Sequence, residues 1–296
     1  VDARRAQELA PGSVLTLIAL AAVAPNPEEQ LALLDQAAAT DPRHPLVWIS
    51  RARLANDRRD LESGVAHATR AIELAPDSTL GWSSRAWAHT AAGRNDLAVP
   101  DYEKAVALAP RSVRTRYLLG YALRDLARYA LAREVLDPAI ELEPRHAKCL
   151  RVRAECRMFL GDYDGAFDDA TRSIEAAPES ETFWIRANSR LMRREFQLAI
   201  EDATAALERN PKSVRALSVR ADAKGALQEW RGAEQDATAA IELGPEVPDA
   251  YSIRAIARSR LGDVKGARAD FERFVKLAPD DPQAADAREW LAANRE

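Results

Sequence analysis

The sequence predicts an all-α protein built as a solenoid of stacked helical repeats, and three observations support this fold class. Eight prolines recur at steps of 34 residues, with a single step of 33: Pro42, Pro76, Pro110, Pro144, Pro178, Pro211, Pro245 and Pro279. Most close a similar phrase, such as Ala71-Ile72-Glu73-Leu74-Ala75-Pro76. The 296 residues include 12 glycines and are 30% charged, a composition typical of helical proteins. This period indicates a solenoid, which grows by adding units and acts through long surfaces.

Three positions in each unit are occupied by small residues. The first series is Ala52, Ala86, Gly120, Ala154, Ala187, Ala221 and Ala255, and the second is Gly64, Ala98, Ala132, Ala166, Ala199, Ala233 and Ala267. The third is Ala71, Ala105, Ala139, Ser173, Ala206 and Ala240, broken by Phe274. Small side chains at fixed places let two helices pack closely. The pattern therefore predicts two helices per unit, with a proline ending the second.

This register of small residues and prolines resembles the tetratricopeptide repeat, as a bacterial-type array, over essentially the whole chain. The regular units are 45–78, 79–112, 113–146, 147–179, 180–213, 214–247 and 248–281, and an irregular unit at about 12–44 completes a repeat solenoid over 12–281. The resemblance implies a right-handed α-solenoid of about eight helix pairs. It also implies that the first helix of each pair, helix A, lines a concave groove, and that helix B follows it.

The ends of the chain depart from the regular units. Residues 1–11 repeat the closing phrase of a unit and are interpreted as the tail of a preceding repeat, which leaves room for a fused N-terminal domain. Residues 282–296 are predicted to form a C-terminal capping helix, with Asp281 as its N-cap and Trp290 and Leu291 buried.

The apolar run 14–24 imitates a secretory signal, but Asp2 and Glu8 interrupt the basic region that such a signal needs. We expect this run to be the fully buried first helix of the solenoid. It is too short to span a bilayer.

Arginine directly precedes the first small position in six of the seven regular units, and an aspartate follows sixteen residues later in five of them. The predicted structural ion pairs are Arg85–Asp101, Arg153–Asp169, Arg186–Asp202, Arg220–Asp236 and Arg254–Asp270. Where Leu119 replaces the arginine, Val135 replaces the aspartate, so the two positions change together. Arg51 is the exception, because it faces His67. We interpret the pairs as contacts between helices A and B rather than as a row that binds anionic ligands.

The inward-facing positions of helix A, as the resemblance places them, are the candidate binding site. They predict a partner-binding groove formed by Trp87, Arg114, Tyr117, Tyr121, Arg124, Lys148, Arg151, Trp184 and Asn188. Aromatic and arginine side chains are common in binding hot spots, and we expect them to contribute little to helix packing. The other interpretation is that these rings pack against neighbouring helices. The same positions of a later unit carry no aromatic or arginine side chain: Ser218, Asp222, Gly225 and Ala226.

Some tetratricopeptide domains grip a C-terminal carboxylate with a lysine and an asparagine four residues apart on one helix A. That pattern is missing from this sequence, since Glu155 follows Arg151 and Trp184 precedes Asn188 at that spacing. A clamp for chaperone tails is therefore disfavoured, and other ways of binding a peptide stay open.

The sequence contains no recognisable motif for catalysis, a metal or a cofactor. The four histidines lack paired-ligand spacing, and there is no glycine-rich phosphate loop. Cys149 and Cys156 are interpreted as buried small residues. The net charge of −4 gives no support for nucleic-acid binding.

We therefore predict a non-catalytic scaffold that binds a protein or peptide in the groove, with no cofactor, no nucleic acid and no membrane contact in this segment. The alternative is a regulatory or substrate-recruiting segment of a larger enzyme whose catalytic domain lies N-terminal to this chain. Few cysteines and the absence of a credible signal favour the cytoplasm.

Overall fold

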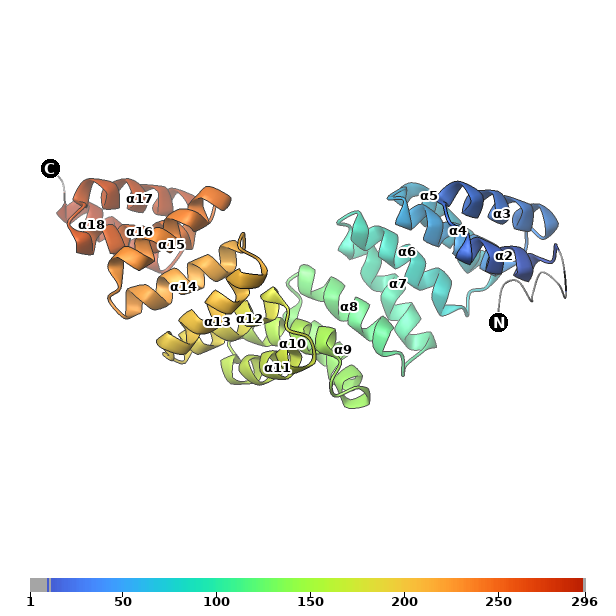
Figure 1. Cartoon of the computed structure of the whole chain (residues 1–296), viewed down its shortest axis with the longest axis horizontal. Helices are drawn as coiled ribbons and strands as arrows, with labels where there is room; N and C mark the ends of the chain where they lie inside the picture. Colours follow the sequence, from blue (N-terminus) through green and yellow to red (C-terminus); the bar gives the residue numbers. More distant parts are fainter. Residues whose placement is uncertain (1–9, 11, 295–296) are drawn as a thin grey trace. The chain divides into compact units, whose positions relative to one another are not determined.

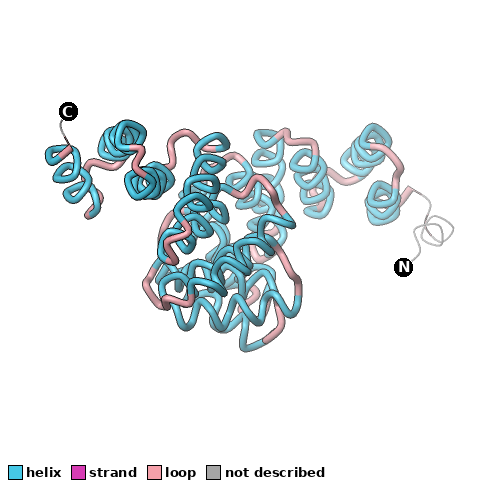
Figure 2. The backbone as a smooth tube through the Cα atoms, turned by 60° about the vertical axis from the view of Figure 1, so that its left-hand side comes forward, coloured by secondary structure: helices cyan, strands magenta, loops and turns pink. Residues whose placement is uncertain are grey.

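The computed structural model describes residues 10 and 12–294, and every element in that part of the chain is an α-helix (Figures 1 and 2). The chain divides into two compact units, residues 1–144 and 145–296. Within each unit every helix packs against the next one along the chain, and short loops join them. This consecutive packing is the arrangement expected of a helical-repeat solenoid.

The helices of the first unit are α2 (Val14–Val23), α3 (Pro27–Thr40), α4 (Pro45–Asp57), α5 (Leu61–Leu74), α6 (Thr79–Ala91), α7 (Asn95–Leu108), α8 (Val113–Asp125) and α9 (Tyr129–Leu142). Those of the second unit are α10 (Ala147–Phe159), α11 (Tyr163–Ala176), α12 (Ser180–Met192), α13 (Phe196–Arg209), α14 (Val214–Ala226), α15 (Trp230–Leu243), α16 (Pro248–Leu261), α17 (Val264–Leu277) and α18 (Gln283–Ala293). From α4 to α17, the even-numbered helices are helices A and the odd-numbered ones are helices B.

The helix boundaries follow the proline period. Helix A of each regular repeat begins at the first residue of its predicted unit, and helix B ends two residues before the proline. In four repeats the carbonyl of this proline accepts a hydrogen bond from a side chain of the helix A that follows. Trp48 Nε1 donates to Pro42 and Trp82 Nε1 to Pro76, each at 2.8 Å. These indoles therefore fix the start of helix A against the turn that precedes it.

The small-residue positions lie in the core of each repeat. Every member of the three series is buried, as close packing of helices A and B requires. At Gly120 a Cβ would lie 2.7 Å from Leu136 Cγ, so this leucine occupies the space that a larger residue would need. Phe274, which breaks the third series, is 1% exposed and packs in a cluster with Phe271 and Trp290.

The turns between helices A and B share one backbone feature. A residue with φ between 55° and 87° stands in each regular repeat: Arg59, Gly93, Ala127, Gly161, Arg194, Gln228 and Gly262. Glycine adopts this left-handed conformation without strain, whereas another residue loses about 1 kcal/mol. Four repeats therefore carry a small strain at a turn of fixed geometry.

Helix α2 packs against its neighbours along one side. Leu17 is buried in a cluster with Leu33 and Val47, which belong to the segments that follow. Leu15 and Val23 are 59% and 68% exposed, so the expectation of a fully buried first helix was wrong. The physical reason is that α3 and α4 cover one face of α2. No helix among the described residues is long and apolar enough to cross a membrane.

Helix α18 packs on α17 at the other end of the chain. Ala284 and Ala287 are buried beside Phe271, and the Trp290 and Phe271 rings lie 4.9 Å apart. Pro282, not Asp281, is the N-cap of α18, and Trp290 and Leu291 are half-buried rather than buried. That this helix caps the array stays a prediction. Most of the predicted tail at residues 1–11 lies outside the described residues.

Candidate functional site

Each of the five predicted arginine–aspartate pairs is present in the structure. In every pair the arginine Nε and Nη2 atoms donate to the two carboxylate oxygens, over 2.6–2.8 Å. The aspartate side chains are 1–9% exposed. Hydrogen bonding to Asp101 raises the pKa of Arg85. These guanidinium edges are occupied, which argues against a role in collecting anionic ligands.

A second cation reaches the same aspartate in four repeats of the second unit. One turn after each pairing arginine stands Arg157, Arg190, Lys224 or Arg258, whose terminal nitrogen lies 2.7–2.9 Å from the carboxylate. The equivalent residue of the first unit is His89, whose pKa is lowered by burial and by Arg94. Sequence analysis missed this second cation, although its spacing of 33 or 34 residues was a usable signal.

A third contact joins some of these arginines to the preceding repeat. We call the arginine–aspartate pairs, with the second cation and this third contact, the ion-pair ladder. The Nη1 atoms of three arginines donate to a threonine sixteen residues earlier: Arg85 to Thr69, Arg220 to Thr204 and Arg254 to Thr238, at 3.2–3.4 Å. Arg51 uses the same direction, because it pairs with Asp35, sixteen residues before it. His67 packs beside Trp48, with the ring centroids 5.6 Å apart, and burial together with Arg51 lowers its pKa. The exception of Arg51 therefore has a simple cause: its carboxylate lies in the preceding helix.

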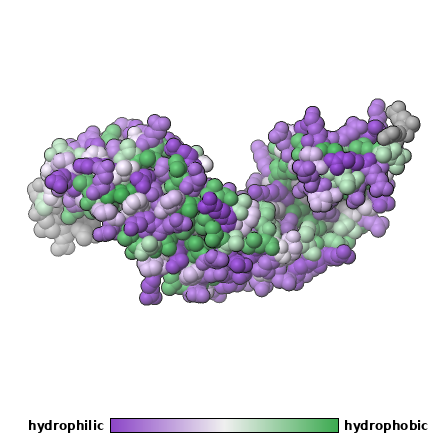
Figure 3. Space-filling view, turned by 180° about the vertical axis from the view of Figure 1, so that it is seen from behind, coloured by the Kyte–Doolittle hydropathy of each residue, from purple (hydrophilic) through white to green (hydrophobic). Residues whose placement is uncertain are grey.

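The second unit contains a groove of about 690 Å³. Its walls come from α10, α12, α14 and α16, with Tyr163 from the start of α11 and Val247 from a turn. The lining residues are Met158, Phe159, Tyr163, Trp184, Asn188, Met192, Val214, Arg215, Ser218, Val219, Val247 and Asp249. Phe159 and Met192 are 49% and 45% exposed, which is high for large apolar side chains. Figure 3 shows similar apolar patches among hydrophilic side chains on one face of the molecule. The groove thus joins an apolar lining to a few polar groups, the usual composition of a ligand site.

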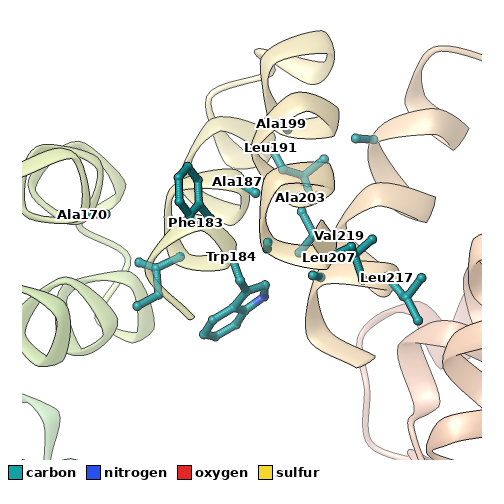
Figure 4. Close-up of a cluster of buried hydrophobic side chains, with 14 of the residues drawn as sticks. Ala170, Phe183, Trp184, Ala187, Leu191, Ala199, Ala203, Leu207, Leu217 and Val219 are labelled. Carbon is teal, nitrogen blue, oxygen red and sulfur yellow. The ribbon is translucent and has the colours of Figure 1, made fainter. Parts of the chain in front are cut away.

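Arg215 on α14 links three successive helices A in the groove. Its guanidinium lies 4.7 Å from the centre of the Trp184 ring and 3.3 Å from Glu155 Oε1, and the Glu155 side chain is 5% exposed. Trp184 itself is 7% exposed and belongs to the same core cluster as Phe183 and Leu217 (Figure 4). The expectation that Trp184 contributes little to packing was therefore wrong, because the next helix A covers its ring.

The far side of the groove is acidic. Asp249 lines it, and Asp222 stands one turn after Ser218 on α14. Burial raises the pKa of Asp222, and repulsion by Asp249 adds to the effect. Burial also raises the pKa of Asp249, with repulsion by Asp281. Both side chains are nevertheless exposed to solvent, so the two carboxylates are open to a ligand.

The other predicted groove residues are spread over both units. In the first unit Trp87, Tyr117, Tyr121 and Arg124 are half-buried, and Arg114 is exposed. The Tyr117 and Tyr121 rings lie 6.2 Å apart, and Arg124 stacks 4.3 Å from the Tyr121 ring centre. In the second unit Lys148 is exposed, while Arg151 pairs with Glu179 at 3.3 Å.

Comparison with known proteins decides the family. Models described as tetratricopeptide repeat match residues 83–137, 117–181 and 226–292, together more than half of the chain. The chain belongs to the tetratricopeptide repeat family. The crystal structure of the APC/C hetero-tetramer Cut9–Hcn1 resembles it with a TM-score of 0.69 over 99% of this chain and 59% of that one. At 14% identity this likeness concerns the fold alone.

Two curated relatives share part of this tetratricopeptide array. The small glutamine-rich tetratricopeptide repeat-containing protein 2 of Mycosarcoma maydis is 29% identical over 120 residues, 40% of this chain and 34% of the relative. The heat-shock protein cognate co-chaperone sgt12 of Aspergillus fumigatus is 32% identical over 94 residues, 32% of this chain and 28% of the relative. The chain thus spans about a third of the length of the curated relatives it matches.

In this tetratricopeptide protein, the groove of the second unit contains two of the nine residues predicted to bind a partner, Trp184 and Asn188. It extends towards α14 and α16, where the residues predicted to face inward are small or polar. The small side chain of Ser218 helps to leave this space open, and a search for large side chains passes over it. Among the described residues no group of three or more His, Cys, Asp or Glu side chains could hold a metal ion. Cys149 and Cys156 are buried thiols.

Proposed function

We propose that this tetratricopeptide protein is a non-catalytic scaffold that binds an extended or helical segment of a partner protein in the groove of its second unit. The observation that carries the proposal is the groove itself, about 690 Å³ in volume, with Phe159, Trp184 and Met192 in its lining. Aromatic and methionine side chains in a concave site provide apolar area that a partner's side chains can bury. Arg215 and Asn188 are polar groups beside them.

Asn188 suits a peptide backbone in particular. Its side-chain amide can donate two hydrogen bonds and accept others, and it makes none with the described residues. A segment lying across α12 would therefore offer its carbonyl and amide groups to Asn188 while its side chains enter the apolar part of the groove. The absence of a recognisable catalytic motif in the sequence supports a role in binding without chemistry.

The same groove serves the alternative, a regulatory or substrate-recruiting segment of a larger enzyme, in which it would hold that enzyme's substrate. One relative is named a heat-shock co-chaperone. A chaperone-tail clamp is not our proposal for this chain, because Arg151 pairs with Glu179 and Arg215 covers Trp184.

Site-specific cross-linking tests the groove. The full chain would carry p-benzoylphenylalanine in place of Tyr163, an aromatic residue of the groove lining, or in place of the exposed Glu208 on helix B α13 as the control. In extract of the cells that make the protein, we expect discrete adducts from position 163 and none shared with position 208. Phe159→Ala combined with Met192→Ala should reduce these adducts by about tenfold, since hot-spot side chains contribute at least about 1 kcal/mol each.

Circular dichroism of each variant would check that the helices remain folded. Adducts from position 208 with none from position 163 would place the binding surface on helices B and overturn the proposal. Adducts at position 163 that persist unchanged in the double alanine variant would do the same for the apolar lining.

A further inference from the structure

The groove of the second unit carries a charge that its own residues do not neutralise. Arg215 is the cation in the lining, and its guanidinium is already engaged by Glu155 and by the Trp184 ring. Asp222 and Asp249, in contrast, form no ion pair with any described residue. The unbalanced charge beside the apolar lining is therefore negative.

The two carboxylates also act on one another. Asp249 raises the pKa of Asp222 by repulsion, and Asp281 does the same to Asp249, in addition to the effect of burial. Like charges held together on a concave surface are costly unless a cation compensates them. A ligand that brings a positive group would remove this repulsion on binding, whereas an acidic ligand would increase it.

We propose that the groove takes a segment that places an apolar side chain against Phe159 and Met192 and a lysine or arginine side chain between Asp222 and Asp249. This inference rests on the proposed function and names the chemistry of the partner. Charge complementarity of this kind sets the choice of partner and its orientation in the groove.

Selection from a random peptide library on the full chain tests this inference. Four proteins are compared: the native chain, Asp222→Lys with Asp249→Lys, the convex control Glu242→Lys, and Phe159→Ala with Met192→Ala. Peptides selected on the native chain should be enriched in sequences that combine an apolar residue with a lysine or arginine. Their affinity should fall on the order of 10- to 100-fold for the double lysine variant and stay within about twofold for Glu242→Lys, because exposed charges away from the site contribute little.

The outcomes separate this inference from the proposed function. One contrary result is that the selected peptides bind the double alanine variant more weakly than the native chain and yet lack basic residues. Another is that they bind the double lysine variant as tightly as the native chain. Either result would overturn the inference and leave the groove as a binding site. Peptides indifferent to the double alanine variant, or no selected peptides at all, would overturn both. Asp222→Asn with Asp249→Asn, which keeps the shape of the groove, should reproduce the loss at a smaller size of about fivefold to tenfold.

Discussion

Removing the Arg220 guanidinium tests the ion-pair ladder at a place where each contact is defined. Arg220 binds both oxygens of Asp236, at 2.7 and 2.8 Å, and donates to Thr204 Oγ1 at 3.2 Å. In Arg220→Ala, the Asp236 carboxylate would remain 2.8 Å from Lys224 Nζ. Breaking a buried pair costs about 3–5 kcal/mol when the other charge is left alone. Because Lys224 stays in place, we expect a loss of about 2–3 kcal/mol.

The chain itself provides the compensating variant. Leu119 and Val135 stand where the third regular repeat would have an arginine and an aspartate, and Leu119 is buried. Arg220→Leu combined with Asp236→Val should therefore recover at least half of the loss, since the buried carboxylate is removed together with Arg220 and the long, partly exposed Lys224 side chain can turn its ammonium group to solvent. Glu242→Gln, on the exposed side of α15, is the matched control and should change the stability by less than about 0.5 kcal/mol.

Amide hydrogen exchange of α14 and α15 is the appropriate assay, because repeat arrays can unfold in parts and a single melting temperature averages over them. Protection in these two helices should fall in Arg220→Ala and return in the double variant. If the single and double variants lost protection equally, Arg220 and Asp236 would not interact energetically, and the reasoning about the ladder would fail.

Two further predictions concern the C-terminal helix and the acidic groove. Deleting residues 282–296 should expose Phe271 and Phe274 and cause association or fraying of α17, measured by light scattering and hydrogen exchange; a monomeric, equally protected protein would show that α18 does not cap the array. Asp222→Asn should stabilise α14 at neutral pH by up to about 0.5 kcal/mol, because a carboxyl whose folded pKa is raised opposes folding when it is ionised. This gain should disappear as the pH falls through the raised pKa towards the ordinary value of 3.8, and equal gains in melting temperature at pH 7 and below pH 4 would contradict it.

The fold could be predicted because the signals that define it repeat within one sequence. The proline period fixed the start of every regular helix A, and the three small-residue series marked the buried contacts. The Arg–Asp pairs could be predicted because Leu119 and Val135 change together, which reveals a contact without an alignment. The threonine contacts, such as that of Arg220 with Thr204, join one repeat to the repeat before it. A comparison of positions within one repeat therefore does not reveal them.

The candidate site could be predicted only in part. The repeat register shows which residues face inward, but the exposure of Trp184 depends on Arg215, a long side chain from the next helix whose conformation the register does not give. The groove also depends on Ser218, where a small side chain leaves space. The volume of the groove is the space that side chains from several helices leave unfilled. It cannot be predicted from the residue types one at a time.

The threonine contact of the ladder has a consequence for how such a chain can gain or lose repeats. Arg254 donates to Thr238, and Arg220 makes the equivalent bond to Thr204. If residues 214–247 were excised, Arg254 would follow Thr204 at the distance at which it now follows Thr238, and it would keep its own Asp270. The junctions that precede Arg220 and Arg254 are thus interchangeable, so the loss or duplication of residues 214–247 restores the same contacts among threonine, arginine and aspartate. An insertion or deletion of any other length between Thr204 and Arg220 would break these contacts, so they tie this part of the array to a fixed repeat length.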